Sequence, residues 1–579
     1  MANKQHGESE ILAALRERYG LRRTKDGLVA EVDSDVVKLS DRFHVGGIAR
    51  AADGRVLGVI LQAGNGGARR LCIAPYQAIR EPKQLASYFE YLGLVPPAEL
   101  RELKILATYI TALAGLRSRV VLAREGIHQV SCDGKRKPVA VIGREVIGAP
   151  ADEFLALPSS VSCYSSQGDL AGWQRGFKPL LLANPLMTLA ACFALAVPLG
   201  SLLGFPLTGL LLAGASSTGK TTLARFVTST FSAPREPHQW SGTANGIEAL
   251  AALHADLPLS LDELGAGDIR QTLATIYRVS GGRAKARATM TGQLQQGEPL
   301  RCALFATGEA TLNQQANAAG TDVRAGHDVR MPTIWVDEAH GVYTDIGKAA
   351  DGAAYAERVA IAMQENYGVL LPAFVGAVVG DVDGARETAE GMRTAILTQV
   401  AGVDVLHMTG VERRVLTAFT NWAIAGELAV AYGALPLKAG EPAAAIAYVF
   451  AKWLARWRAL AQGPSLAPLR NLSDFFKRNH HRFAPIKDWQ DSASASGRLG
   501  YRRATASHGD HFLVFRDVFE KDAAQKHGVD ACVNALRDAG LLIAGKKGRT
   551  LLVRMPRSED GERMALYAIR ANVMFDTEE

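Results

Sequence analysis

The sequence predicts a multidomain α/β protein whose centre is a parallel β-sheet with a phosphate-binding loop. Three observations predict this fold. A glycine-rich loop lies between an apolar strand and an amphipathic helix near residue 214. Two further apolar strands follow along the chain and end in polar residues, and Ala-rich segments with helical spacing come after residue 346.

Length and composition set the number of domains. The chain has 579 residues, of which 48% are hydrophobic and 21% charged, as in a folded globular protein. At roughly 150 residues per domain, this length predicts about three or four domains. We expect a β-rich N-terminal domain (residues 1–160), a P-loop core (161–345), an α-helical lid or bundle (346–465) and a C-terminal winged-helix-like domain (466–579).

Net charge, cysteine spacing and targeting signals limit the possible partners and the cell compartment of the protein. The formal charge of +7 fits a polyanion partner but does not establish one. The six cysteines lie far apart without a CxxC pair, so no zinc site or disulfide framework is indicated. The polar N-terminus has no signal core, and we expect a cytoplasmic protein. Residues 179–213 are almost uncharged, yet their prolines, their glycines and the phosphate loop that follows favour a buried helix, a turn and a central strand over a membrane span.

The sequence of the N-terminal region predicts several short strands and one helix. Residues 43–74 contain three short strands with turn residues between them, a helix is expected near residues 99–116, and further strands continue to about residue 160. No primase or nuclease cluster is recognisable there. We expect a structural or assembly role for this region.

The phosphate loop carries the strongest chemical signal. Gly214, Gly219, Lys220 and Thr221 match the pattern G-x-x-x-x-G-K-[ST] between a strand and a helix. Backbone N–H groups of such a loop turn toward phosphates, the lysine reaches the β- and γ-phosphates and the hydroxyl ligates Mg²⁺. The predicted contacts with ATP are Gly214, Ala215, Ser216, Ser217, Thr218, Gly219, Lys220, Thr221 and Thr222.

Two acids and a threonine complete the predicted site. Asp262 and Glu263 end the apolar strand in LPLSLDE, the position of a Walker B motif. With Thr221, Asp262 is expected to hold the metal, and Glu263 is expected to act as the base that polarises water. Thr307, at the end of the next apolar strand, would lie between the two Walker motifs and sense the γ-phosphate.

Several basic residues are candidates for contacts outside the nucleotide. Arg283, Lys285 and Arg287 alternate with small residues after two glycines, a pattern that presents cations to a phosphate backbone or to solvent. Arg324 and Arg330 precede a strand, and from there an arginine can reach a neighbouring subunit's γ-phosphate; a salt bridge is the alternative.

The C-terminal region has the outline of a winged helix. A helix over residues 516–526, a turn at 527–528, a second helix over 529–539 and a hairpin with a basic tip at 545–549 are predicted. Such a module binds DNA or contacts protein. The expected DNA contacts at the tip are Lys546, Lys547 and Arg549.

Several short motifs in fixed order resemble one bacterial family. GASSTGKTT, WSGTANGIEALA, LPLSLDE, GGRAKARA, FATGE and AGHDVR together resemble the domain of unknown function 927 family, which is similar to superfamily 3 helicases and AAA+ motors of phages and mobile elements. The resemblance runs from about residue 43 through the core, and the tail, with RFAP and GRLGYRR, is similar to the C-terminal extension of longer members. Two departures are EGIH, where members more often carry Trp before His128, and Thr307, where superfamily 3 helicases commonly carry Asn.

The resemblance implies a fold and an activity. The fold is an AAA+/superfamily 3 helicase-like core, and the activity is ATP hydrolysis by a Mg²⁺-dependent homo-hexameric ring that moves on single-stranded or forked DNA, as the replicative helicase of a phage or mobile element. It also implies Arg330 as the arginine finger and residues 283–287 as a DNA-facing loop. The rival from another class is a nucleotide-gated scaffold that never unwinds nucleic acid. A small-molecule kinase is disfavoured, because adjacent Asp262 and Glu263 suit attack by water.

Overall fold

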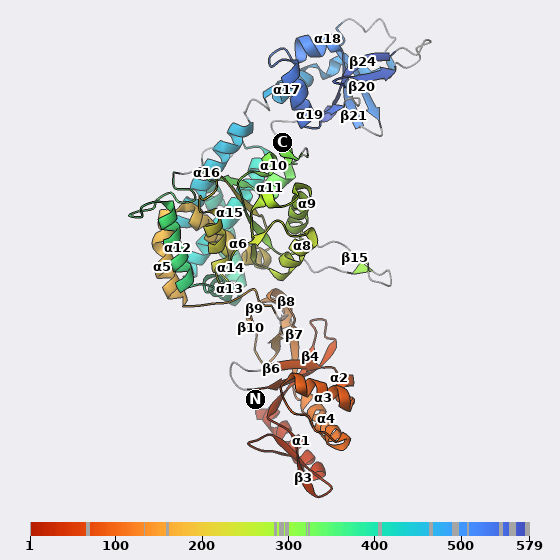
Figure 1. The fold of residues 1–579 in the computed structure, drawn as a ribbon, viewed down its shortest axis with the longest axis vertical. Coiled ribbons are helices and arrows are strands. Elements are labelled where there is room, and N and C mark those ends of the chain that lie inside the picture. Colours follow the sequence, from red (N-terminus) through yellow and green to blue (C-terminus); the bar gives the residue numbers. More distant parts are fainter. Residues whose placement is uncertain are drawn as a thin grey trace. The chain divides into compact units, whose positions relative to one another are not determined.

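The computed structural model divides into two compact units. The first holds residues 1–166, 201–203 and 372–383, and the second holds the rest of the chain. Figure 1 shows the ribbon, with residues 1–166 of the first unit in red to orange and most of the second unit in yellow to blue. The structure describes residues 2–64, 70–132, 134–157, 161–282, 287–288, 294–295, 300–319, 321, 323, 325–337, 339–402, 408–461, 467–488, 497–505, 509–543, 548–554 and 563–573.

The first unit is built on a mixed five-stranded sheet of order β11-β7-β4-β5-β6. Its central strands contain runs of consecutive buried residues, and the core around Val59, Leu61, Phe89 and Leu106 is closed by helices that follow the strands. The expected strands and the expected helix are present. The elements are β4 (Phe43–Arg50), β5 (Val56–Ala63), β6 (Arg70–Ala74), β7 (Ser118–Leu122), β11 (Phe154–Ala156), α2 (Tyr76–Arg80), α3 (Pro82–Tyr91) and α4 (Leu100–Ala114).

Two small antiparallel sheets accompany it. The sheet of order β1-β2-β3 follows the N-terminal helix and was not predicted. The other sheet has the order β10-β9-β8. The elements are α1 (Ala2–Tyr19), β1 (Arg22–Arg23), β2 (Leu28–Val32), β3 (Asp35–Ser40), β8 (Gly126–Cys132), β9 (Lys135–Ile142) and β10 (Glu145–Ile147).

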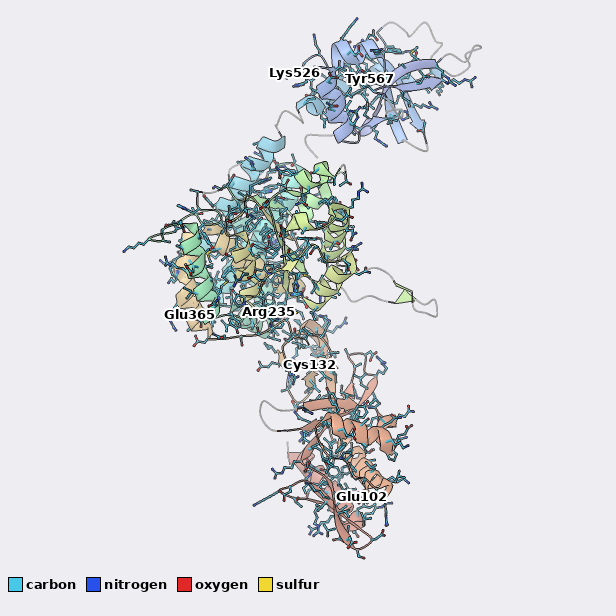
Figure 2. All side chains as sticks on the ribbon, viewed as in Figure 1. Glu102, Cys132, Arg235, Glu365, Lys526 and Tyr567 are labelled. Carbon is cyan, nitrogen blue, oxygen red and sulfur yellow. The ribbon has the colours of Figure 1, made fainter. Side chains whose placement is uncertain are left out.

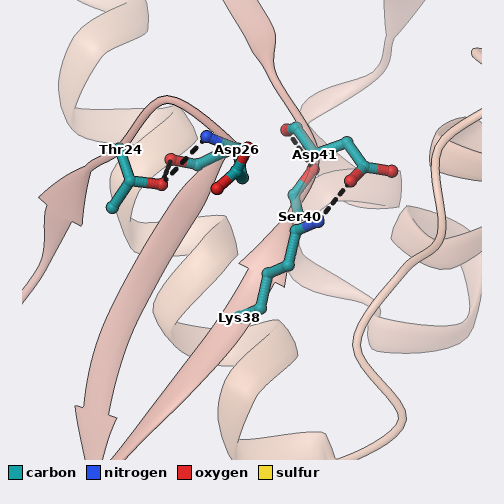
Figure 3. A network of polar contacts seen from close by, with 6 residues as sticks. Thr24, Asp26, Lys38, Ser40 and Asp41 are labelled. Atoms are coloured by element: carbon teal, nitrogen blue, oxygen red, sulfur yellow. Dashed lines mark hydrogen bonds and ion pairs between the residues drawn. The ribbon is translucent and has the colours of Figure 1, made fainter.

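The turn into β2 depends on one glycine. Gly27 has φ +140, and a Cβ atom there would lie 2.0 Å from the Ser40 carbonyl oxygen. Thr24 Oγ1 donates to the Gly27 carbonyl at 3.1 Å and accepts from the Asp26 N–H at 3.3 Å. Figure 3 shows this turn beside the end of β3, where Lys38 Nζ lies 2.5 Å from Asp41 Oδ1. Glycine is needed because another residue would meet the backbone of the neighbouring strand.

The second unit contains the predicted parallel sheet, in the order β13-β14-β17-β12-β18. Every residue of β12 and β17 is buried, because helices cover both faces of the sheet. The order places β17 between β12 and β14, as expected from the sequence. The strands are β12 (Leu210–Ala213), β13 (His238–Gln239), β14 (Pro258–Asp262), β17 (Ala303–Gly308) and β18 (Thr333–Trp335).

Helices connect these strands. The last residues of α9 lead into a short two-stranded ribbon that precedes β17. The connecting elements are α7 (Lys220–Ser229), α8 (Ala244–Leu253), α9 (Ile269–Ser280), β15 (Arg287–Ala288), β16 (Leu294–Gln295), α10 (Leu312–Ala318) and α11 (Ala325–Arg330).

The apolar stretch before the loop folds as α5 (Leu170–Ala183), α6 (Pro185–Leu203) and β12. In the part of the chain that the structure describes, α6 is the one helix long and apolar enough to cross a membrane, and 89% of its apolar window is buried inside the protein. Phe193 on α6 contacts Phe305 of β17 and Trp422, with ring centroids 5.4 and 5.6 Å apart. These contacts are those of a core helix.

The predicted lid region is helical but is not set apart as one domain. Residues 372–383 group with the first unit, whereas the other helices group with the parallel sheet. Helix α12 packs on α5 and α7, and α15 on α11 and α16. The helices are α12 (Gly352–Glu365), α13 (Leu370–Gly380), α14 (Val382–Ala401), α15 (Gly410–Ala431) and α16 (Glu441–Ala461).

The C-terminal segment differs from the predicted winged helix. The first helix begins at Arg516 as expected but continues as a π-helical turn to Ala523, and the second helix is confirmed. The strands around the predicted tip pair with β24 and not with each other in the described residues. The elements are α17 (Ala467–Asn479), β19 (Phe483–Pro485), β20 (Gly500–Thr505), β21 (Gly509–Val514), α18 (Arg516–Val518), α19 (Val529–Asp538), β22 (Leu542–Ile543), β23 (Leu551–Arg554) and β24 (Arg563–Arg570).

One face of this C-terminal sheet packs against helices. Tyr567 of β24, labelled in Figure 2, stacks on Phe519 with centroids 4.1 Å apart, and its hydroxyl donates to Glu520 at 3.2 Å. Phe512 of β21 stacks on Phe476 of α17 at 4.9 Å. This helix-covered face therefore holds the larger aromatic core, and the other face carries a smaller cluster that includes Tyr501.

Candidate functional site

The loop between β12 and α7 is held in a conformation that requires small residues. Ser217 and Gly219 adopt left-handed backbone angles, with φ of 60° and 85°. A Cβ atom on Gly214 would lie 2.5 Å from the Val336 carbonyl oxygen, and one on Gly219 would lie 2.8 Å from Val342. The loop opens directly into the N-terminus of α7. Left-handed residues at a helix start turn backbone N–H groups toward an anion.

Lys220 is the first residue of α7 and lies over the loop. Its side chain is mostly buried, with 8% of the residue exposed. Its Nζ donates to the carbonyl oxygens of Gly214 at 2.9 Å and Ala215 at 2.5 Å, and to Thr218 Oγ1 at 3.2 Å. Burial lowers the pKa of Lys220, and the carboxylates of Glu309 and Asp262 partly oppose this shift. The phosphate loop and the carboxylates of Glu309 and Asp262 therefore hold the Lys220 ammonium group at the place where the phosphates of a nucleotide are expected.

Asp262 connects the two predicted Walker motifs. Thr221 Oγ1 donates to Asp262 Oδ2 at 3.0 Å, which brings the end of β14 beside the start of α7. Thr307 is fully buried on β17, and its hydroxyl donates to Asp262 Oδ1. Both contacts orient the carboxylate. Thr307 thus acts on Asp262 in this structure, and its role as a sensor of the γ-phosphate stays a prediction.

Glu263 occupies a rare backbone conformation. Its φ of 57° is left-handed, which is unusual for a residue other than glycine, and its N–H donates to Asp262 Oδ1 at 2.9 Å. The side chain is exposed at the mouth of a cleft. Strained backbone of this kind concentrates at functional sites, because the surrounding structure must hold it there.

The cleft has a volume of about 720 Å³ and contains most of the predicted nucleotide contacts. Sequence reasoning missed the residues on its other wall, among them Glu309, His340 and Asp351. Glu309 belongs to the same FATGE motif as Thr307, so its place at a strand end was the available signal. No local pattern marks His340 or Asp351. The predicted residues that line the cleft are Ser216, Ser217, Thr218, Gly219, Lys220, Thr221, Thr222, Asp262 and Glu263.

Residues 339–343, on the wall of the cleft that sequence reasoning missed, contact the phosphate loop directly. The Val342 N–H donates to the Thr218 carbonyl at 2.8 Å. A Cβ atom on Gly341 would lie 2.2 Å from the same carbonyl oxygen, and Gly341 has φ +71. Glycine is required there because the two backbones touch. Residues 339–343 therefore belong to the site, although they lie about 120 positions after the loop in the sequence.

Arg330 lies at the opposite edge of the sheet from this cleft. It ends α11 before β18, and its carbonyl accepts from the N–H of Gly209, which precedes β12. Since β12 and β18 are parallel, this is the amino edge, whereas the phosphate loop follows the carboxyl end of β12. Arg330 is therefore remote from its own chain's cleft.

The Arg330 side chain is held in place by α9. Its guanidinium lies 4.2 Å from the centroid of the Tyr277 ring, and its Nη1 donates to the Gly326 carbonyl at 2.9 Å. The His327 ring meets Tyr277 edge-on at 4.4 Å. No ion pair to Arg330 occurs among the described residues, so the predicted alternative of a salt bridge finds no support there.

The predicted DNA contacts are only partly described. Arg283, Lys285, Arg324, Lys546 and Lys547 lie outside the described residues, and of Arg287 only the backbone, in β15, is described. Arg549 forms an ion pair with Asp530 at 2.5 Å between two exposed side chains. DNA binding by these residues stays a prediction.

Asp328, two residues before Arg330, gives the stability of the protein an expected pH dependence. Burial raises its pKa from 3.8 to about 7, with its backbone N–H opposing the shift. The folded state then binds a proton more tightly than the unfolded state, so this stability is present below about pH 4 and is lost as pH rises toward 7. The loss is about 4 kcal/mol at most, at about 1.4 kcal/mol per pKa unit.

Asp328→Asn should therefore raise the melting temperature at pH 8 and change it little at pH 5. Thermal unfolding at both pH values checks this, with Asp337→Asn, an exposed acid nearby, as the matched control. Equal shifts of the Asp328→Asn variant at both pH values would contradict the assignment.

Comparisons with known proteins give a family match for part of the chain. Residues 81–298 match the family model described as "Domain of unknown function (DUF927)". The resemblance inferred from the motifs is confirmed, over a shorter range than expected. The match includes the phosphate loop, Asp262 and Glu263 but ends before Thr307 and Arg330. No curated protein matches the chain.

Two solved structures are similar to the chain. The SCCmec type IV Cch structure, described as an active helicase, aligns with 95% of this chain and 96% of its own at 17% identity and a TM-score of 0.58. This likeness shows a shared fold. The apo NrS-1 C-terminal region aligns with 91% of this chain and 96% of its own, at 9% identity and a TM-score of 0.31.

Proposed function

From the DUF927 match and the geometry of the cleft, we propose that this chain is a Mg²⁺-dependent ATPase that works as a homo-hexameric ring and couples hydrolysis to movement on DNA. The observation that carries the ATPase is Asp262, held by Thr221 and Thr307 beside the phosphate loop, with Glu263 next to it at the cleft. The similar fold of an active helicase supports the DNA motor, as the replicative helicase of a phage or mobile element.

The residues at the cleft suit Mg²⁺ and ATP. A hydroxyl and a carboxylate, 3.0 Å apart, offer the hard oxygen ligands that Mg²⁺ prefers. When bound, Mg²⁺ would neutralise charge on the β- and γ-phosphates. Loop N–H groups and Lys220 bind the phosphates, while Thr307 keeps the Asp262 carboxylate aligned. Glu263 accepts a proton from the attacking water, because its carboxylate is exposed at the cleft and not tied to a described cation.

The position of Arg330 supports a ring. At the amino edge of the sheet it is remote from its own cleft, so an action on the γ-phosphate requires a neighbouring subunit. The Tyr277 ring and the Gly326 carbonyl hold the guanidinium ready for such a contact. Arginine fingers supplied by a neighbour act in this way on P-loop sites.

The proposed function predicts that DNA raises ATP turnover. Single-stranded or forked DNA added to the purified full chain should increase the steady-state rate of phosphate release, and Lys220→Ala should abolish turnover with and without DNA, since it removes the cation from the loop. A wild-type rate that DNA leaves unchanged, together with ATP-dependent assembly, would favour the nucleotide-gated scaffold over the motor.

A further inference from the structure

The turn that carries Glu263 continues into a short 3₁₀-helix, Leu264–Ala266. Glu263 leaves β14 with left-handed backbone angles, φ 57° and ψ 66°, and its carbonyl oxygen accepts from the Ala266 N–H at 2.9 Å. Among the described residues, Glu263 forms its hydrogen bonds through its backbone, and none holds its carboxylate. The place of this carboxylate at the cleft therefore depends on the conformation of the turn.

The Gln315 side chain lies against this turn and bonds to two of its backbone groups. Its amide nitrogen donates to the Leu264 carbonyl oxygen and its amide oxygen accepts from the Gly265 N–H, both at 3.2 Å. The orientation of the amide follows from these neighbours, because the nitrogen can only donate and the oxygen can only accept. A planar amide therefore satisfies a carbonyl and an N–H that lie next to each other in the turn.

Helix α10 holds Gln315 in place. The first turn of the helix is closed by two reciprocal contacts: the Thr311 N–H donates to Gln314 Oε1 at 2.9 Å, and the Gln314 N–H donates to Thr311 Oγ1 at 3.2 Å. Leu312 and Ala316 of the same helix are fully buried in the core cluster that includes residues of β14 and β17. Gln315 therefore extends toward the turn from a helix whose first turn and buried face are fixed.

The end of β17 packs on the same turn. A Cβ atom on Gly308 would lie 3.0 Å from the Leu264 Cβ and 3.7 Å from the Leu264 backbone nitrogen. Gly308 directly follows Thr307, whose hydroxyl donates to Asp262. The segment from β17 to α10 thus orients Asp262 through a hydroxyl and holds the following turn through the amide of Gln315.

We propose that Gln315 is a positioning residue for Glu263: its amide fixes the left-handed turn and so holds the carboxylate where it accepts a proton from the attacking water. This role rests on the proposed function, which makes Glu263 the base. Gln315 is not among the residues that line the cleft, so it acts through the backbone of the turn and not on the nucleotide. A displacement of about 1 Å at a reacting group can lower a rate about 10²-fold.

The test compares two neighbouring glutamines of α10 in the full chain. Gln315→Ala should lower kcat for ATP hydrolysis by about 10- to 100-fold and leave KM and nucleotide affinity close to the wild type, because it releases the turn and leaves the phosphate loop unchanged. Gln315→Met keeps the length of the side chain without its donor and acceptor, and should lose kcat in the same way. Gln314→Ala is the matched control, since that side chain bonds to Thr311 at the start of the helix, and it should stay close to the wild type.

Combination with Glu263→Gln tests whether Gln315 acts through the carboxylate. Adding Gln315→Ala to Glu263→Gln should cause no further loss of single-turnover hydrolysis, because the group that Gln315 positions is already removed. Losses that multiply would show a separate structural effect and overturn the proposal. A Gln315→Met variant with wild-type kcat, or equal losses in Gln314→Ala and Gln315→Ala, would overturn it as well.

The same variants distinguish failure of the positioning role from failure of the proposed function. Slow hydrolysis by Glu263→Gln, together with wild-type kcat in both Gln315 variants, would remove the positioning role alone and leave Glu263 as the base. Wild-type hydrolysis by Glu263→Gln would remove the base itself, and the role of Gln315 would fall with it.

Discussion

Arg330→Ala should bind ATP nearly normally and hydrolyse it about 10³ to 10⁵ times more slowly than the wild type. Arg330 lies at the amino edge of the sheet, remote from the cleft of its own chain. Its loss should therefore remove the proposed contact with the neighbour's γ-phosphate and leave the binding cleft intact. Nucleotide affinity by equilibrium binding and turnover by phosphate release separate the two effects.

Rings assembled from two different variants test directly whether Arg330 acts across the subunit interface. Some junctions between Arg330→Ala and Lys220→Ala subunits combine an intact Lys220 with an intact Arg330 from the next subunit, so part of the activity should return on mixing. Each variant alone should hydrolyse ATP very slowly, so even a small recovery of ATPase activity on mixing would be detectable. If the mixture stays inactive although the subunits co-assemble, Arg330 does not act across the interface, and Arg324 becomes the residue to test.

Substitutions of Tyr277 provide a matched control. Tyr277→Phe keeps an aromatic ring under the guanidinium, whereas Tyr277→Ala removes the surface that lies 4.2 Å from it. We expect the alanine variant to follow Arg330→Ala in kcat with little change in KM, and the phenylalanine variant to stay close to the wild type. Equal losses in both would point to a structural role of the tyrosine hydroxyl.

Glu263→Gln should retain ATP and lower hydrolysis by about 10² to 10⁴-fold. The amide preserves the size of the side chain and its exposed position at the cleft, but it cannot accept the proton of the attacking water. Asp262 and Lys220, which we propose to hold the metal and the phosphates, are untouched, so binding should survive. Single-turnover hydrolysis and nucleotide binding, measured on the same preparation, check the expected loss of hydrolysis and the expected retention of ATP.

Glu309→Gln is the matched control for that experiment. Glu309 lines the same cleft and is also exposed, but it follows β17 instead of β14. We expect Glu309→Gln to keep most of the activity. If Glu309→Gln is inactive and Glu263→Gln is active, the base must be reassigned to Glu309.

The sequence by itself determined the phosphate loop, the acid pair and the strands that carry them. Gly219, Lys220 and Thr221 stand within one turn of each other, and an apolar strand before the loop needs only its own composition to be recognised. Such features depend on backbone preferences and burial over a few neighbouring residues. The helices of residues 346–465 were predictable for the same reason. Their grouping was not, because residues 372–383 belong to the first unit, where Val379 lies against the distant Gly148.

Only the tertiary structure decided which distant residues meet. It brought the hydroxyl of Thr307 to Asp262, laid Gly341 across Thr218 and placed Arg330 at the edge away from the cleft. It also paired the strands at the predicted C-terminal hairpin with β24, and that register aligns Arg503 with His511 and Arg570. Strand order and register depend on long-range packing, and a slip of one residue moves every side chain to the other face, so local patterns cannot specify these contacts.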